Sequence, residues 1–177
     1  MGYRWILFCP KLASTPSSPR VMVWRRMHSV GSVGLDNGLW ILPHTPESEQ
    51  FVQEMKAYVE SQGGSSRVFL VDSLDAATEE EILTRFREDR AMEYGEVMEQ
   101  CIDFLAEIGK EINRQNLTFA EYEENEEDLR KLESWFEKVK KRDILAGKEA
   151  EEASEGLEKC RQALQCFADE VFNHEKE

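Results

Sequence analysis

The residues of this chain that could carry out chemistry are few and widely spaced. The three histidines, His28, His44 and His174, lie far apart and fit no zinc-binding spacing. The sequence contains no G-x-S-x-G nucleophile motif, no H-E-x-x-H motif and no glycine-rich phosphate loop. We therefore expect no catalytic residues, no metal and no cofactor. His28 falls at the edge of an apolar helix face, which favours a structural role over a catalytic or ligand role.

Two acidic runs, Glu79 to Glu81 and Glu121 to Asp128, are candidate cation sites. Neither shows the alternation of ligands that a calcium-binding loop requires. We interpret both runs as solvated helix ends or loops.

A basic segment near the start of the chain is the main candidate for binding. Residues 1 to 35 contain five basic and no acidic residues. Arg25 and Arg26, with Arg20 and Lys11 nearby, could neutralise the phosphates of a nucleic acid. The alternative is that this basic face docks against the acidic second half of the same chain. The sequence leaves both interpretations open.

A second candidate stripe follows later in the chain and consists of Arg85, Arg87 and Arg90. These side chains could extend a nucleic-acid surface. The alternative is that they form ion pairs, three or four residues apart on one helix, with nearby glutamates. Those glutamates are Glu81, Glu88 and Glu93.

The first 72 residues predict strand, helix, strand, strand, helix and strand in that order. Residues 4 to 9 form a short apolar run that is typical of a buried strand. Ser17 or Ser18 can cap a helix with Pro19 at its first position. Asn37-Gly38 suits a two-residue type I′ turn between two strands. Thr45 can cap a second helix that ends at Gly63-Gly64, and residues 67 to 71 form the last strand. This order is the ferredoxin-like βαββαβ pattern.

The helical period assigns inner and outer faces to these elements. In the first helix, Val21, Val23, Trp24 and Met27 fall on the apolar side, and Arg25 falls on the other. In the second helix, the buried stripe is Phe51, Val52, Met55 and Val59. We expect four large side chains to be at least partly buried, namely Trp24, Trp40, Phe51 and Phe69.

The second half of the chain predicts long helices. Thr78 with Glu81 forms a capping-box signal, and apolar residues then recur at helical spacing as far as Ile112. Residues 129 to 139 mark a second helix. Residues 153 to 171 alternate apolar steps of four and three, which is the heptad rhythm. With connectors near residues 116 to 118 and at Gly147, this half predicts a helical hairpin or a three-helix bundle.

Charge and cysteine usage support two domains, residues 1–75 and 76–177. The first carries seven Lys or Arg and seven Asp or Glu, so the second carries the whole net charge of −14. The four cysteines are widely spaced, which favours free thiols in a reducing compartment. No apolar run reaches the length of a signal peptide or membrane span. We expect an α+β protein in the cytoplasm, without a membrane partner.

Several motifs together resemble the N-terminal domain of ChrB, a chromate-responsive bacterial regulator. They are Trp5-Ile6-Leu7-Phe8, Lys11-Leu12, Pro16 to Arg20, Val23 to Arg26, Gly38 to Pro43, Phe86 to Arg90, Glu93-Tyr94, Phe119 to Glu121, Glu124 to Leu129 and Lys131 to Glu133. The resemblance covers nearly the whole chain. It implies a transcriptional regulator of chromate-resistance genes with DNA as its partner. The family's regulators usually carry a further C-terminal domain that this sequence does not contain.

The first 72 residues are also distantly similar to the middle domain of the phenylacetate repressor PaaX and to small ferredoxin-like CRISPR nucleases. In those nucleases the first strand ends in an acidic residue, and here that position is Cys9. Without the carboxylate a metal-dependent nuclease lacks its expected ligand. DNA binding therefore comes first, a protein interaction module second and a divergent nuclease third. The operator, the inducer and the oligomeric state, including a homodimer, stay open.

Overall fold

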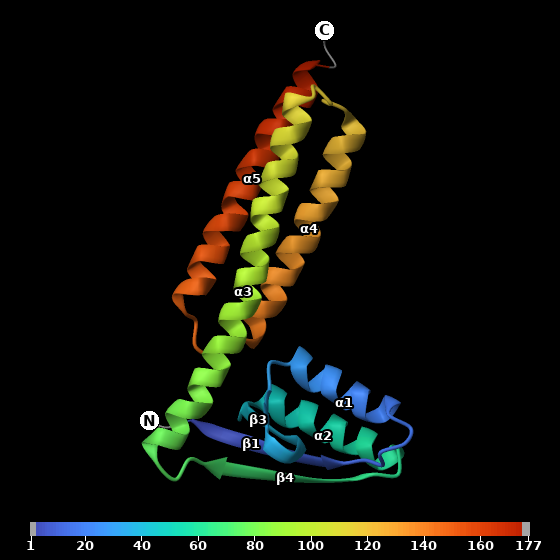
Figure 1. Ribbon diagram of the computed structural model, residues 1–177, viewed down its shortest axis with the longest axis vertical. Helices are drawn as coiled ribbons and strands as arrows, with labels where there is room; N and C mark the ends of the chain where they lie inside the picture. Colours follow the sequence, from blue (N-terminus) through green and yellow to red (C-terminus); the bar gives the residue numbers. More distant parts are fainter. Residues whose placement is uncertain (1–2, 175–177) are drawn as a thin grey trace. The chain divides into compact units, whose positions relative to one another are not determined.

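The computed structural model describes residues 3–174 as a mixed α+β structure with one antiparallel sheet and five α-helices (Figure 1). The α+β class expected from the sequence is confirmed. The chain divides into two units, one up to Arg87 and one from Glu88 onward, which we call the sheet unit and the helical bundle. The division falls inside one long helix, α3 (Ala76–Asn113). The division expected from the sequence, after residue 75, coincides with the start of that helix.

The sheet has four strands in the order β2-β3-β1-β4. They are β1 (Arg4–Lys11), β2 (Val33–Leu35), β3 (Leu39–Pro43) and β4 (Ser65–Asp72). Every neighbouring pair is antiparallel. Strand β1 is central, and its Leu7 lies opposite Ile41 on one side and Phe69 on the other. Strands β2 and β4 are the two edges.

Two helices, α1 (Ser18–Ser29) and α2 (Pro46–Ser61), lie together on one face of this sheet (Figure 1). Because side chains alternate along a strand, Ile6 and Phe8 of β1 point to the same face. They join a buried cluster with residues of β3 and both helices. The other members are Val23, Met27, Trp40, Leu42, Val52, Met55 and Val59.

The beginning of α3 packs on the opposite side of β1. Trp5 points away from the α1 and α2 side, and its ring stacks on Phe86 at a centroid distance of 5.5 Å. Glu79 accepts hydrogen bonds from the Tyr3 backbone N–H at 2.7 Å, from Trp5 Nε1–H at 3.2 Å and from the Ser73 hydroxyl. The first acidic run is therefore not simply solvated, since Glu79 ties the first turn of α3 to β1.

The β2–β3 hairpin is present, but its turn differs from the prediction. Leu35 pairs with Leu39, so three residues, Asp36–Gly38, form the loop instead of two. They adopt a 3₁₀ conformation, and Gly38 has a φ of 76°. A three-residue loop of this kind needs a left-handed residue only at its last position, where glycine has no Cβ to clash.

The helical phase predicted for α1 is wrong at Trp24. Val23 and Met27 are buried, whereas Trp24 is 55% exposed and Val21 is 42% exposed. Residues 21 to 24 are all apolar, so their pattern does not single out one face. Trp40 and Phe51 are buried or half-buried as expected, but Phe69 is 49% exposed because it belongs to an edge strand.

The starts of α1 and α2 agree with the sequence, but the predicted capping hydrogen bond is present only in α2. Thr45 caps α2 by accepting a hydrogen bond from the Ser48 N–H at 3.1 Å. Ser17 stands at the N-cap of α1, but its side chain makes no capping hydrogen bond. Helix α3 begins before Thr78, because Asp75 accepts from the Thr78 N–H at 2.8 Å and so takes the capping role.

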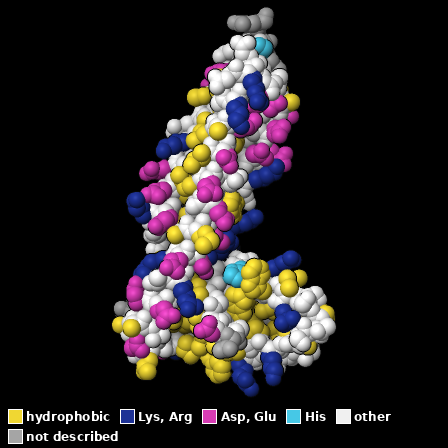
Figure 2. Space-filling view, in the orientation of Figure 1, with side chains coloured by type: hydrophobic (Ala, Val, Ile, Leu, Met, Phe, Trp, Pro, Cys, Tyr) yellow, Lys and Arg dark blue, Asp and Glu magenta, His cyan; other side chains and the backbone are white. Residues whose placement is uncertain are grey.

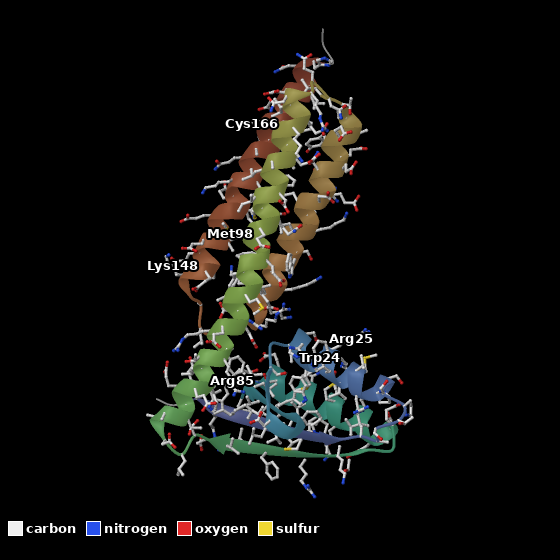
Figure 3. All side chains as sticks on the ribbon, viewed as in Figure 1. Trp24, Arg25, Arg85, Met98, Lys148 and Cys166 are labelled. Atoms are coloured by element: carbon white, nitrogen blue, oxygen red, sulfur yellow. The ribbon has the colours of Figure 1, made fainter. Side chains whose placement is uncertain are left out.

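The helical bundle consists of the rest of α3 with α4 (Phe119–Arg142) and α5 (Lys148–His174). The predicted three-residue and four-residue steps in α5 are confirmed, since they mark its buried face. Those residues are Ala153, Leu157, Cys160, Leu164, Phe167 and Val171. Gly156 is also buried, and a Cβ there would lie 2.8 Å from Sδ of Met98 (Figure 3). The helices α3 and α5 therefore approach closely at this point.

Candidate nucleic-acid interface

Helix α1 carries three of the predicted binding residues, and the structure distinguishes them by their partners. Arg20 Nη2–H donates to the Ser14 carbonyl at 2.6 Å. Arg26 Nη2 lies 3.4 Å from Glu54 Oε2, and its guanidinium is 5.6 Å from the centre of the Phe51 ring. Arg25 is exposed and makes no ion pair or hydrogen bond with any residue from 3 to 174 (Figure 3). Arg25 and Arg20 are therefore the cations of this helix that no described carboxylate neutralises, with Arg20 held by a neutral carbonyl, and Arg26 belongs to the α1–α2 contact.

Lys11 ends β1 and is exposed. No ion pair involves it within the described part of the chain. Lys11 thus resembles Arg25 in having a charge that other side chains do not neutralise.

The second candidate stripe does not form an open basic surface. Arg85 pairs with Glu81 at 3.4 Å, and Arg87 pairs with Glu80 at 2.6 Å. Arg90 is 7% exposed and faces Glu93 at 3.0 Å. These findings favour the ion-pair interpretation, with Glu80 in the place expected for Glu88. An exposed role for Arg90 was wrong, because its guanidinium is buried.

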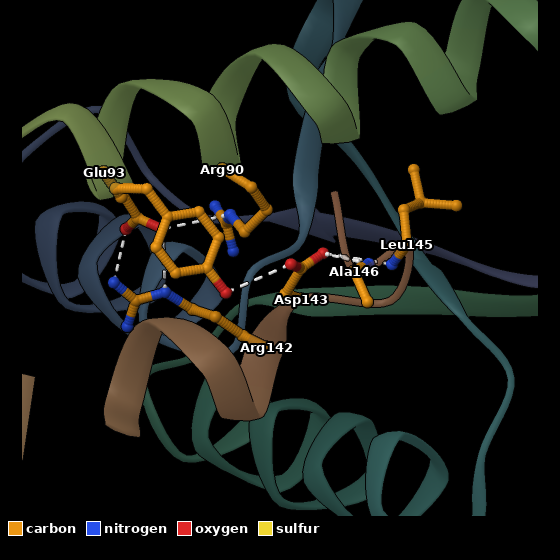
Figure 4. Close-up of polar contacts among 7 residues, drawn as sticks. Arg90, Glu93, Arg142, Asp143, Leu145 and Ala146 are labelled. Atoms are coloured by element: carbon orange, nitrogen blue, oxygen red, sulfur yellow. Dashed lines mark hydrogen bonds and ion pairs between the residues drawn. The ribbon is translucent and has the colours of Figure 1, made fainter. Parts of the chain in front are cut away.

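Arg90 belongs to a polar cluster that joins α3 to the end of α4 (Figure 4). Glu93 lies between Arg90 and Arg142, and Arg142 Nε–H donates to it at 3.2 Å. Arg90 Nε forms an ion pair with Glu93 but no hydrogen bond. Arg90 Nη1 has no hydrogen-bond partner among the described residues. Burial lowers the pKa of Arg90, while Glu93 acts in the opposite direction. Glu93 is thus the counter-ion on which two arginines depend.

The same cluster closes the α4–α5 loop. The Tyr94 hydroxyl donates to Asp143 Oδ2 at 3.1 Å, and Asp143 Oδ1 accepts from the N–H groups of Leu145 and Ala146 at 3.0 and 3.2 Å. Burial, together with the Asp143 carboxylate, raises the pKa of Tyr94. Its hydroxyl therefore stays protonated and acts as a permanent donor. The cluster is a structural clamp.

The sequence prediction missed an aromatic group on α1 beside Arg25. The centroids of the exposed Trp24 ring and the His28 ring lie 4.4 Å apart. The His28 ring in turn contacts the Trp40 ring edge-on, at a centroid distance of 5.3 Å. Trp24 and His28 are one helical turn apart, and this spacing was the signal that could have revealed the pair. The structural role expected for His28 fits its place between the two indoles. An exposed indole next to a free guanidinium suits the stacking of a base and the contact of a phosphate.

The cysteines are unbridged, as expected, with Cys101 and Cys160 buried and Cys166 exposed (Figure 3). Cys160 Sγ lies 3.6 Å from the Cys101 carbonyl oxygen. Burial raises the pKa of Cys160 to about 12 and also raises the pKa of Cys101. Among residues 3 to 174, no group of three or more Cys, His, Asp or Glu side chains could hold a metal ion.

Surface charge separates the two units. Through Arg87 the chain has nine basic and ten acidic residues, whereas from Glu88 onward it has thirteen and twenty-six. Figure 2 shows acidic side chains spread along the helices of the bundle and hydrophobic side chains gathered on the visible face of the sheet unit. No described helix is both long enough and apolar enough to span a membrane.

Comparison with known proteins places the chain in a family. Residues 20–177 match the family described as "Protein ChrB, N-terminal", and the chain therefore belongs to this family. It is also similar to Protein ChrB of Cupriavidus metallidurans, with 29% identity over 94 residues. That match covers 53% of this chain and 28% of the relative's length. No solved structure matches the chain.

Proposed function

We propose that this chain acts in bacterial chromate resistance as a transcriptional regulator that binds DNA through α1. Membership of the ChrB N-terminal family supports the biological context. The observation that carries the DNA-binding part is the exposed pair of Trp24 and Arg25, which lies in the segment of the chain with no acidic residue before Asp36. Phosphate contacts supply much of the affinity of such proteins, and α1 offers a cation that no described carboxylate neutralises.

The sheet unit supports this proposal as a scaffold. We take it to be ferredoxin-like, because its elements run β1-α1-β2-β3-α2-β4 and its strands are ordered β2-β3-β1-β4. In this arrangement α1 is held by Val23 and Met27 in the core, which leaves Arg25 on the surface. A rigid helix with a fixed phase positions a cation better than a loop does.

A binding role is proposed in preference to a catalytic one. Cys9 lies near the end of β1, opposite Arg67 of β4, at the position where the related nucleases carry a carboxylate. Neither the thiol of Cys9 nor the guanidinium of Arg67 supplies the oxygen ligand that a magnesium ion prefers. The cytoplasm is the compartment that this role requires.

A salt titration of DNA binding tests the proposal. Fluorescence anisotropy would be measured with a duplex from the protein's own operon and with a scrambled duplex, between 50 and 200 mM salt. Arg25→Glu should weaken binding to both duplexes, and Arg25→Ala should reduce the salt slope by about one unit. Trp24→Ala should weaken binding and leave the slope unchanged, because it removes a contact without a charge.

Lys138→Glu is the matched control, since it makes the same change of charge on an exposed side chain of α4. It should not affect binding. Arg26→Glu is a poor test, because the new carboxylate would face Glu54 and disturb the α1–α2 contact. Equal losses from Arg25→Glu and Lys138→Glu, or wild-type protein without salt-sensitive binding, would contradict DNA binding by α1. The second hypothesis, a protein interaction module, would then replace it.

A further inference from the structure

The two edges of the sheet differ in a way that the proposed function does not explain. Strand β2 has three residues, and the Arg85 guanidinium donates to the Gly34 carbonyl at 3.5 Å. Strand β4 has eight residues and pairs with β1 on one side. On its outer side, no residue from 3 to 174 completes its backbone hydrogen bonds. A long open edge of this kind is a template for another strand.

The side chains of β4 add to this difference. An open edge is commonly protected by proline, a charged side chain or a short strand, and β4 has eight residues, no proline and one charged side chain, Arg67, before its last residue. Its middle is Val68-Phe69-Leu70-Val71, and Phe69 and Leu70 are 49% and 44% exposed. Each points to a different face of the sheet because they are adjacent. Apolar surface is therefore exposed on both sides of this edge.

A cavity lies between α2 and β4 and opens beside the edge. It has a volume of about 320 Å³ and a mixed lining, in which the apolar Val52, Val68 and Leu70 lie beside the polar His44, Glu49, Gln53 and Lys56. A strand added to β4 would form the missing wall of this cavity. Strand addition beside a helix is a common recognition mode, in which alternate side chains fill the groove.

We propose that the added strand is β4 of a second copy of this chain, paired antiparallel and centred on Phe69. A two-fold axis perpendicular to the sheet keeps each side chain on its own face, so the two Phe69 rings meet directly. On the other face, Val68 of each copy lies opposite Leu70 of the second copy. Each copy then supplies the apolar side chains that cover the other's cavity, and the two sheets become one.

Neighbouring registers are less favourable. A pairing centred on Val68 would place Phe69 opposite Arg67, and one centred on Leu70 would place Phe69 opposite Val71. The register centred on Phe69 forms an aromatic pair, which stabilises antiparallel strands. It also places Asp72 of the second copy opposite Ser66.

Charge complements this register at the ends of the strand. Helix α2 ends at Ser61, and a short turn leads into β4 at Ser65, so Lys56 lies nearer the start of β4 than Gln53 does. Asp72 of the second copy, which pairs with Arg4 of its own chain at 3.6 Å, therefore approaches Lys56 as a second cation. The sheet unit has nearly balanced charge, so the paired edges themselves add little repulsion. A second copy is thus a matched occupant for this edge.

Sedimentation velocity of the full chain over a range of concentrations tests the proposal. Wild-type protein should show a monomer–dimer equilibrium. Phe69→Lys with Leu70→Lys should raise the dissociation constant by about 100-fold or more, because lysine at a strand edge blocks pairing. The control, Leu74→Lys with Met92→Lys, adds the same charge at exposed apolar residues outside β4 and should leave the equilibrium unchanged. Far-UV circular dichroism checks that each variant is folded.

Disulfide trapping tests the register. In a Cys9→Ser, Cys166→Ser background, Phe69→Cys should yield a disulfide-linked dimer on mild oxidation, because residue 69 meets its own copy. Arg67→Cys should not, since it lies opposite Val71 of the second copy, and removal of Cys9 prevents a bond to its neighbour on β1. A monomer at all concentrations, a dimer unaffected by the lysines, or equal cross-linking of both variants would overturn the proposal.

Discussion

In the helical bundle the large apolar side chains of α5 recur at regular steps and are buried, with the exception of Phe172 at 56% exposure, whereas in the sheet unit several large apolar side chains lie on the surface. Phe167 and Leu157 are at most 1% exposed, while Trp24 and Phe69 are about half exposed. The bundle also carries twice as many acidic as basic residues, and the sheet unit is nearly balanced. The regular steps of α5 therefore fill the bundle core, whereas Trp24 and Phe69 leave apolar surface exposed on the sheet unit.

Truncation of the bundle core should have the largest effect. Phe167→Ala removes a fully buried ring of α5 and should lower the free energy of unfolding by about 3–5 kcal/mol. Urea unfolding followed by circular dichroism measures this change. Ile102→Ala, at a 61% exposed position of α3, should change it by less than about 0.5 kcal/mol. Similar losses in both variants would contradict the division into buried and open faces.

The ionic clamp of the bundle should give the next largest effect. Glu93→Gln removes the direct ion-pair partner of the buried Arg90 and of the partly buried Arg142 and should lower the free energy of unfolding by about 3 kcal/mol. The control is Glu127→Gln, which breaks an exposed pair with Lys131 and should leave the urea midpoint unchanged. If Glu93→Gln left the free energy of unfolding unchanged, the cluster would not stabilise the contact between α4 and α3.

The buried thiols of the bundle should make stability fall at alkaline pH. The pKa of Cys160 is raised from 9.0 to about 12 in the folded state, so the unfolded thiol ionises first as pH rises. The stabilisation is complete below pH 9 and is lost between pH 9 and 12. Urea unfolding across this range should show a shallower pH dependence for Cys160→Ala. At pH 8, iodoacetamide should modify Cys166 and leave Cys160 and Cys101 intact.

The sheet unit should show a smaller effect at acid pH, through Glu79. Hydrogen bonds from Ser73 and from the Tyr3 backbone lower the pKa of Glu79 below its usual 4.5. Its contribution is present above pH 4.5 and is lost as pH falls through the lower, folded-state value. Tryptophan fluorescence during unfolding should show a weaker acid dependence for Glu79→Gln. Glu80→Gln, at an exposed pair with Arg87, should keep the wild-type dependence.

Local sequence patterns predicted the helical bundle more completely than the sheet unit. In α5 the spacing of apolar residues identified every buried residue except Gly156, because mostly polar residues fill the positions between them. In α1 four consecutive apolar residues left the phase undetermined, and Trp24 was placed inside. The hairpin was predicted correctly, but the length of its turn depended on which residues of β2 and β3 pair.

The candidate site was predicted in part. The available cation Arg25 was found because it lies on the polar side of α1. The sequence named Glu93 as a partner of Arg90, which is confirmed, but it did not show that Arg26 would pair with Glu54 or that Glu93 would also pair with Arg142. Those partners lie 28 and 49 residues apart in the sequence, and only the packing of separate helices brings them together.

The sequence by itself determined the α+β class, the helices of the bundle, the free thiols and the basic segment before residue 36. These properties follow from composition and from periodicities of two to four residues, which act locally. The tertiary structure alone decided that Trp24 is exposed, that Arg90 is buried and that one sheet edge is open while the other is capped. Exposure, ion pairing and strand pairing depend on neighbours that are distant in sequence, so no local pattern can encode them.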